Sequence, residues 1–128
     1  MIYIDSSILI AQLLAEDRRP PASLWEGPLV SSRLLETETW ITLHSRGKAE
    51  LRESLWFLLA RLSILEMQET VLTRALEPFP APVRAVNAIH LASADFLRRM
   101  GEDISIATYD ARMSATAKEM EFEIISLD

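Results

Sequence analysis

The sequence predicts an α/β fold in which helices cover both faces of a short central parallel sheet, a three-layer α/β/α sandwich. Short apolar runs typical of buried strands alternate along the chain with longer segments of helical periodicity. The 128 residues have the length of one domain, so residues 1–128 are predicted to form a single domain. Hydrophobic residues make up 49% of the chain, which supplies a core without disulfides.

Charge and composition exclude several kinds of protein. The chain has no cysteine, which removes thiolate nucleophiles and cysteine-ligated zinc and fits a reducing, cytoplasmic location. No apolar run reaches the ~18 residues of a membrane span, and no basic segment precedes the first apolar run, so neither a membrane segment nor a signal peptide is expected. The net charge of -6 should repel nucleic acid unless a basic patch or a bound cation intervenes.

The first half of the chain alternates twice between strand and helix. Its predicted elements are strand 2–5, helix 6–17, loop 18–28, strand 29–32 and helix 33–46. The loop is rich in proline and glycine, which punctuate regular structure. Gly47 is predicted to end the second helix, because glycine readily adopts the left-handed conformation common at helix C-termini. A strongly helical pattern follows over 48–62.

The second half of the chain continues the alternation. Its predicted elements are a strand or connector at 63–67, helix 68–79, helix 83–100, strand 104–109, helix 110–120 and strand 122–126. Pro80 and Pro82 separate the two successive helices. Gly101 is the predicted stop of the long helix, whose last turn carries two arginines that suit a helix C-terminus.

Two aspartates directly follow predicted strands. Asp5 comes after the apolar run of strand 2–5, and Asp110 comes after strand 104–109. In parallel sheets, functional sites form at the carboxyl ends of the strands, near the point where the strand order reverses. Aspartate is also a favoured N-cap residue, and each of these two precedes a predicted helix. The sequence alone leaves both interpretations open.

A third acid is expected from helix 33–46, which offers Glu36 and Glu38. At 3.6 residues per turn these two side chains point in nearly opposite directions. Glu38 shares a stripe with Leu34 and Ile41, which we expect to face the core. A carboxylate on a core-facing stripe is costly unless it is paired or bound to metal. Glu38 is therefore the predicted functional acid, and Glu36 is predicted to be solvated or to face a partner.

The long helix supplies a fourth position. Asn87 lies on one face with Val83 and Ala94, and His90 follows one turn later on the same face. The alternative interpretation is a hydrogen-bonded amide and a core histidine, since a single histidine without a matched partner is weak evidence of ligation. The nucleotide-binding, hydrolase and zinc-site motifs with known mechanics are absent from the sequence.

Together these residues resemble the PIN-domain ribonucleases, and within them the VapC-type toxins of toxin–antitoxin modules. "YIDSSILI" is similar to the opening strand of the family, which places Asp5 as its first metal-site acid. "LVSSRLLETE" resembles a segment in which an acid follows a small polar pair, and this acid is Glu38. "RAVNAIHLASA" resembles a helix that usually carries aspartate where this chain has Asn87. "IATYDARM" resembles the Thr-x-Asp segment, placing Thr108 and Asp110.

The resemblance implies a Mg²⁺- or Mn²⁺-dependent endoribonuclease with a PIN-like fold, acting as the toxin of a type II module. Asp5, Glu38 and Asp110 would be the metal ligands, and Asn87 would be a weakened fourth corner of the catalytic site. Ser6, Thr108 and Arg112 are the expected supporting residues. The implied partners are RNA, a small VapB-like antitoxin and a second copy in a homodimer. Candidate interface aromatics are Trp40, Trp56 and Phe57.

Two other functions remain open from the sequence. Asn87 is also what a catalytically degenerate PIN-fold module would carry if it kept only its partner surface. A phosphoaspartyl enzyme on a similar sheet is disfavoured, because a dehalogenase-type phosphatase would place a second acid where this chain has Ser7.

Overall fold

The computed structural model describes residues 1–15 and 17–128 and has five parallel strands in one sheet. The strands lie in the order β3-β2-β1-β4-β5, so the chain builds outward from β1 in one direction and then in the other. Their bounds are β1 Ile2–Ile4, β2 Leu29–Ser32, β3 Leu62–Leu65, β4 Ser105–Ala107 and β5 Glu123–Ile124. The predicted parallel sheet is confirmed, and residues 62–65 form a strand rather than only a connector.

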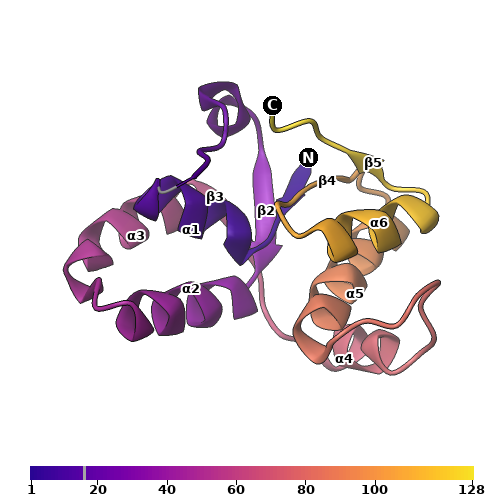
Figure 1. Ribbon diagram of the computed structural model, residues 1–128. Coiled ribbons are helices and arrows are strands. Elements are labelled where there is room, and N and C mark those ends of the chain that lie inside the picture. The colour runs from indigo at the N-terminus through magenta and orange to yellow at the C-terminus, as the bar shows by residue number, and fades with distance from the viewer. Residues whose placement is uncertain (16) are drawn as a thin grey trace.

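Helices lie on both sides of this sheet. Their bounds are α1 Ser6–Leu14, α2 Leu34–Ser45, α3 Arg52–Leu59, α4 Glu69–Ala75, α5 Ala85–Arg99 and α6 Ala111–Glu119, with short 3₁₀ turns at Ala22–Glu26 and Ala49–Leu51. Figure 1 shows α1, α2 and α3 on one side of the sheet and α4, α5 and α6 on the other. The predicted three-layer α/β/α arrangement is therefore confirmed. None of the described helices is long and apolar enough to cross a membrane.

The alternation of side chains along the strands creates two separate cores. Tyr3 on β1 and Ile106 on β4 belong to the core beneath α5 and α6. Ile4 and Ala107, the next residue on each strand, belong to the core beneath α1, α2 and α3. Both faces of the central strands are thus buried, which explains why β1 reads as a continuous apolar run rather than an alternating one.

Several element ends differ from the predicted boundaries. The helix predicted over 6–17 ends at Leu14, where Ala15 adopts a left-handed conformation with φ 48°, and residue 16 lies outside the described part of the chain. The long helix begins at Ala85 instead of residue 83, because Arg84 is extended and forms its N-cap. Gly47 and Gly101 end their helices as predicted, with φ values of 66° and 98°.

The reversal of strand order falls between β1 and β4. These strands pair in parallel with Ile4 opposite Ala107, so Asp5 and Thr108 emerge side by side at the carboxyl edge of the sheet. β2 flanks β1 on its other side and leads directly into α2. The topology therefore brings the starts of α1, α2 and α6 to the same edge, where a site is expected.

Candidate active site

Asp5 sits at the switch point of the sheet and is 4% exposed. Ser7 Oγ donates to its Oδ1 at 2.5 Å, and Thr108 Oγ1 donates to its Oδ2 at 2.7 Å. Asp5 occupies the N-cap position of α1, but within the described chain its side chain makes no capping bond to that helix. The capping interpretation does not account for Asp5. Its carboxylate is instead held by two hydroxyl groups at the sheet edge.

Asp110 does act as a helix cap. Its Oδ1 accepts hydrogen bonds from the backbone N–H groups of Arg112 and Met113 at 2.9 and 3.1 Å. Its second oxygen, Oδ2, accepts from Asn87 Nδ2 at 3.0 Å. The backbone N–H of Asp110 in turn donates to Thr108 Oγ1 at 3.0 Å, which links this residue to Asp5. Asn87 is therefore a direct neighbour of an acid at the switch point, and not a remote core amide.

Glu38, rather than Glu36, is the α2 acid at this edge. Its Oε2 accepts from Ser6 Oγ at 3.1 Å, and its Oε1 lies 2.5 Å from His90 Nε2. Glu36 instead forms an ion pair with Arg33 at the surface. The predicted reason for choosing Glu38 was wrong, since Ile41 is 62% exposed and does not mark the core-facing stripe. The core-facing positions of α2 are Leu35, Thr39 and Leu43, and Glu38 lies beside this stripe.

The sequence interpretation gave Tyr3 no role and treated His90 as weak evidence of ligation, and both side chains adjoin the site. His90 is fully buried, as expected of a core histidine, but it bridges two other side chains. Tyr3 Oη lies 2.6 Å from His90 Nδ1, and the two rings pack edge to face at 5.7 Å between centroids. The position of His90 one turn after Asn87, noted in the sequence, did indicate its place, whereas Tyr3 read only as part of an apolar strand.

The surroundings of the two aspartates shift their pKa values in opposite directions. Burial raises the pKa of Asp5 above its usual range, and the nearby charge of Glu38 adds to this, although bonds from Ser7 and Thr108 oppose it. Burial would also raise the pKa of Asp110, but hydrogen bonds from Asn87 and from the first turn of α6 outweigh it and lower this pKa. Of these two aspartates, Asp5 is therefore the one whose ionised form its surroundings disfavour.

Hydroxyl groups place the three acidic residues near one another. Thr108 bonds to the Asp5 carboxylate and to the backbone N–H of Asp110. Ser6, which directly follows Asp5, bonds to the Glu38 carboxylate. In this arrangement no three acid, cysteine or histidine side chains among residues 1–15 and 17–128 surround a single point as metal ligands would. The available donors beside Asp5 are almost all carboxylate and hydroxyl oxygens, the kind that Mg²⁺ and Mn²⁺ prefer.

A groove of about 470 Å³ adjoins the site beside Asp110. It is lined by Pro82, Val83, Arg84, Asn87, Asp110 and Arg112. Both arginines are exposed, so two cationic side chains flank an otherwise acidic edge. Such a groove suits an anionic ligand that reaches the carboxylates from the α5–α6 side.

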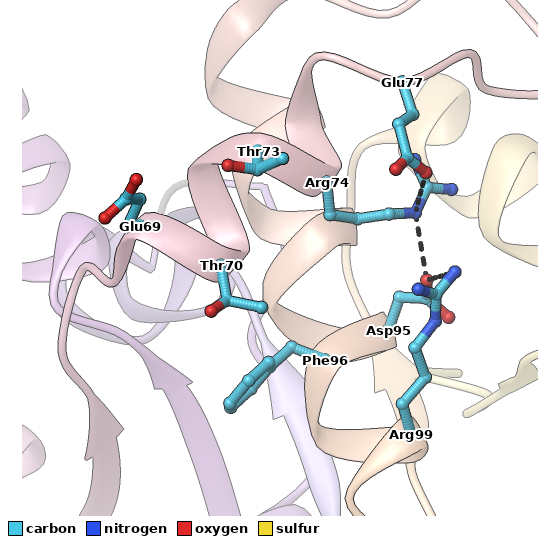
Figure 2. A pocket seen from close by; sticks show the side chains of 8 residues that line it. All are labelled: Glu69, Thr70, Thr73, Arg74, Glu77, Asp95, Phe96 and Arg99. Carbon is cyan, nitrogen blue, oxygen red and sulfur yellow. Dashed lines mark hydrogen bonds and ion pairs between the residues drawn. The ribbon is translucent and has the colours of Figure 1, made fainter.

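A second buried acid, Asp95, lies on the same helix as Asn87 but in a different environment. Arg74 of α4 and Arg98 and Arg99 of α5 contact its carboxylate at 3.0, 2.9 and 3.1 Å. Figure 2 shows Arg74 and Arg99 reaching Asp95 from two directions, with Glu77 beside Arg74. Burial would raise the pKa of Asp95, but its bonds to Arg98 and Arg74 hold the pKa below its usual range. This cluster ties α4 to α5.

Comparisons with known proteins agree with this fold. The model of the PIN domain family matches residues 2–128. Ribonuclease VapC46 of Mycobacterium tuberculosis (strain ATCC 25618 / H37Rv) is 32% identical over 98% of this chain and 96% of its own length. Ribonuclease VapC47 of Mycobacterium tuberculosis (strain CDC 1551 / Oshkosh) is 31% identical over 95% of this chain and 93% of its own length.

A solved structure shares the fold at lower identity. The chain is similar to Mycobacterium tuberculosis VapC20, described as a toxin that cleaves the sarcin-ricin loop, with a TM-score of 0.67 and 20% identity. The match covers 90% of this chain and 94% of that one, and at this identity it supports the fold alone. The family model and the two ribonuclease relatives show that the chain belongs to the PIN-domain family, among the VapC-type ribonucleases.

Proposed function

We propose that this protein is a divalent-metal-dependent endoribonuclease and the toxin of a type II toxin–antitoxin module. One observation carries the proposal. Three acidic residues from separate segments, Asp5, Glu38 and Asp110, lie at the switch point of the sheet, where Thr108 contacts Asp5 and the backbone of Asp110 and Ser6 contacts Glu38. The relatives named as ribonucleases span nearly the whole chain, which favours RNA as the substrate.

Mg²⁺ or Mn²⁺ fits the donor atoms of this site. The three carboxylates would be its ligands, and because burial raises the pKa of Asp5, a bound cation would favour the ionised form of this carboxyl group. Once bound, such a cation lowers the pKa of a coordinated water and stabilises negative charge on a phosphoryl group. Glu38 and Asp110 would exchange their present bonds to Ser6 and Asn87 for the cation.

The remaining residues would orient the acids and the RNA. Ser7 and Thr108 hold the two oxygens of Asp5 in one orientation, which removes the need to order this side chain during binding. Arg84 and Arg112 line the adjoining groove and would bind backbone phosphates of RNA. These local cations would offset the repulsion expected from a net charge of -6.

Asn87 is expected to attenuate this activity. Its amide donates to Asp110 and so occupies one of the oxygens that a cation would use. An amide oxygen can bind a metal but adds no negative charge, and hard divalent cations bind more weakly when the ligands carry less charge. Loss of metal binding altogether would leave the alternative, a degenerate module that keeps only its partner surface.

The toxin role requires protein partners. Trp56 and Phe57 on α3 are 51% and 70% exposed, and the half-buried Trp40 on α2 lines a groove together with Trp56. Large exposed aromatics are enriched at protein interfaces. We expect this surface to receive a VapB-like antitoxin or a second copy of the chain, and we expect the module to act in the cytoplasm.

The direct test is cleavage of total RNA by the purified protein. Wild-type protein should cleave with Mn²⁺ and stop when EDTA is added, while Glu36→Gln should cleave as the wild type does. Asp5→Ala should be inactive although folded. Cleavage that persists in EDTA, or in well-folded Asp5→Ala, would contradict the proposed mechanism. Failure of the wild type to bind Mn²⁺ or to cleave would favour the degenerate module.

A further inference from the structure

Glu38 is held by a buried pair of side chains from two other elements. His90 of α5 lies with Nε2 2.5 Å from Glu38 Oε1, and Tyr3 of β1 lies with Oη 2.6 Å from His90 Nδ1. The side chain of Glu38 is 20% exposed, whereas Tyr3 and His90 are both 0% exposed. The pair therefore connects the core beneath α5 to an acid at the sheet edge.

The direction of the two hydrogen bonds follows from the chemistry of the groups. An ionised carboxylate only accepts, so His90 Nε2 must carry the proton that it shares with Glu38. In the neutral imidazole the other nitrogen then accepts, and the Tyr3 hydroxyl donates to it. Burial raises the pKa of Tyr3, which keeps that hydroxyl protonated. Tyr3 thus donates to His90 and His90 donates to Glu38, so the Tyr3 hydroxyl and both ring nitrogens of His90 have hydrogen-bond partners.

We propose that His90, oriented by Tyr3, is a positioning residue that fixes the Glu38 carboxylate for cation binding. This inference rests on the proposed function, because it assigns His90 a role only if Glu38 is a metal ligand. A glutamate has three rotatable side-chain bonds, and a fixed donor on Oε1 restricts the orientation of its carboxylate, while Oε2 can exchange its bond to Ser6 for the cation. Partners of this kind typically change metal affinity by about 10–100-fold when they are removed.

The contrasting role for His90 is that of a core side chain whose bonds serve folding only. The two roles differ in which substitution each tolerates. A core residue is replaced best by an apolar side chain, and Leu keeps the volume of the site filled. A positioning residue is replaced best by a side chain that keeps a donor near Glu38, and the Gln amide keeps one.

The experiment measures Mn²⁺ affinity by isothermal titration for four variants beside the wild type. They are His90→Gln, His90→Leu, Tyr3→Phe and Leu91→Val. Leu91 follows His90 on α5, is fully buried and lies in the core beneath that helix, so Leu91→Val controls for general loss of stability. We expect His90→Leu to weaken Mn²⁺ binding at least about tenfold, His90→Gln to stay within about threefold, and Leu91→Val to lower Tm without changing affinity.

Tyr3→Phe keeps the proposal testable if His90→Leu does not fold, because it removes a single oxygen and leaves the imidazole in place. It should weaken Mn²⁺ binding by a smaller factor than His90→Leu. Imidazole ¹⁵N NMR of the metal-free wild type gives an independent readout. It should show a slowly exchanging proton on Nε2 of His90, and Glu38→Ala should lose that slow exchange.

Three results would overturn the inference. They are equal Mn²⁺ affinity in folded His90→Leu and the wild type, equal affinity in Tyr3→Phe and the wild type, and a His90 Nε2 that carries no slowly exchanging proton. Failure of the wild type itself to bind Mn²⁺ is a separate result. It would overturn the proposed function, and the role of His90 in cation binding with it.

Discussion

Asp5 and Asp95 are both buried aspartates, at 4% and 3% exposure, yet their surroundings give them opposite properties. Three arginines contact Asp95, and its pKa is lowered. Asp5 is held by the hydroxyls of Ser7 and Thr108, lies near the charge of Glu38, and has a raised pKa. Burial of an acid therefore does not mark a functional site. The charge balance around the acid is what separates the two.

The physical cause of this difference is the cost of removing a charge from water. A buried carboxylate is tolerated when opposite charges and hydrogen bonds replace its hydration. Asp95 has that replacement within the chain, so its role is structural. Asp5 has hydrogen bonds but no Lys or Arg ion pair among the described residues, and under the proposed function a cation from solution would supply the opposite charge.

The largest expected effect is that of Asp5→Ala on RNA cleavage. Loss of one ligand should lower kcat/KM by at least about 100-fold, which corresponds to about 2.7 kcal/mol of transition-state stabilisation. The fold should survive, because the side chain does not cap α1 and because Ser7 and Thr108 keep bonds to the backbone of residues 109 and 110. Circular dichroism and single-turnover cleavage check the two parts. Collapse of the fold would show that Asp5 is structural, as Asp95 is.

Asp95→Asn should have the opposite profile. Removing the charge leaves Arg74 largely buried without its main partner, which should cost about 3 kcal/mol of the free energy of unfolding. Cleavage per folded molecule should not change, since Asp95 lies outside the site. Urea denaturation and cleavage measure the two quantities. The matched control is Arg99→Ala, whose side chain is 66% exposed and should contribute less than about 1 kcal/mol. A large loss of cleavage in folded Asp95→Asn would contradict the purely structural role assigned to Asp95.

Asn87→Asp should place a second negative charge beside Asp110, as Glu38 places one near Asp5. The change replaces a donor 3.0 Å from Asp110 with a second carboxylate, so the metal-free protein should lose about 1 kcal/mol of stability. Mn²⁺ affinity should rise by about tenfold because the ligand charge increases, and cleavage should rise with it. Isothermal titration decides the outcome. Equal affinities for both proteins would remove position 87 from the metal site.

The pH dependence of stability should distinguish the two buried acids in metal-free protein. Asp95 has a lowered pKa, so the advantage of wild type over Asp95→Asn should be full above the unfolded pKa of about 3.9 and vanish as pH falls through the folded pKa. Asp5 has a raised pKa, so Asp5→Asn should be more stable than wild type at neutral pH. That gap should close as pH falls through the folded pKa of Asp5. Urea titrations from pH 3 to 8 measure the two stability differences, each taken as wild type minus variant. If both differences changed with pH in the same direction, these assignments would be contradicted.

The smallest expected effect is that of Glu36→Gln. Glu36 pairs with Arg33 at the surface, and such pairs contribute about 0–1 kcal/mol. Stability, Mn²⁺ affinity and cleavage should all stay close to wild type. Glu38→Gln, two residues further on, should instead lose most Mn²⁺ binding. Similar losses in both variants would mean that the two acids of α2 are not distinguished by their surroundings.

Much of the fold could be predicted from local patterns. The strands at 2–4 and 29–32 and the stops at Gly47 and Gly101 follow from apolar runs and from glycine geometry, which act over a few residues. Helix ends were less predictable, as Ala15 shows, because its left-handed turn ends α1 without a glycine. The prediction of which apolar stripe of α2 faces the core was also wrong, since Ile41 is apolar but faces solvent. Periodicity alone does not say which of two apolar faces meets the sheet.

The sequence by itself determined the alternation of strands and helices, placed Asp5 and Asp110 next to predicted strand ends, and placed Glu38 on the helix that follows strand 29–32. Only the tertiary structure decided which roles those acids have. The bond from Thr108 to Asp5, the bond from Asn87 to Asp110, and the bridge from Tyr3 through His90 to Glu38 all join segments distant in sequence. The physical reason is that electrostatic compensation depends on distances of about 3–4 Å between such segments, which local sequence patterns do not encode.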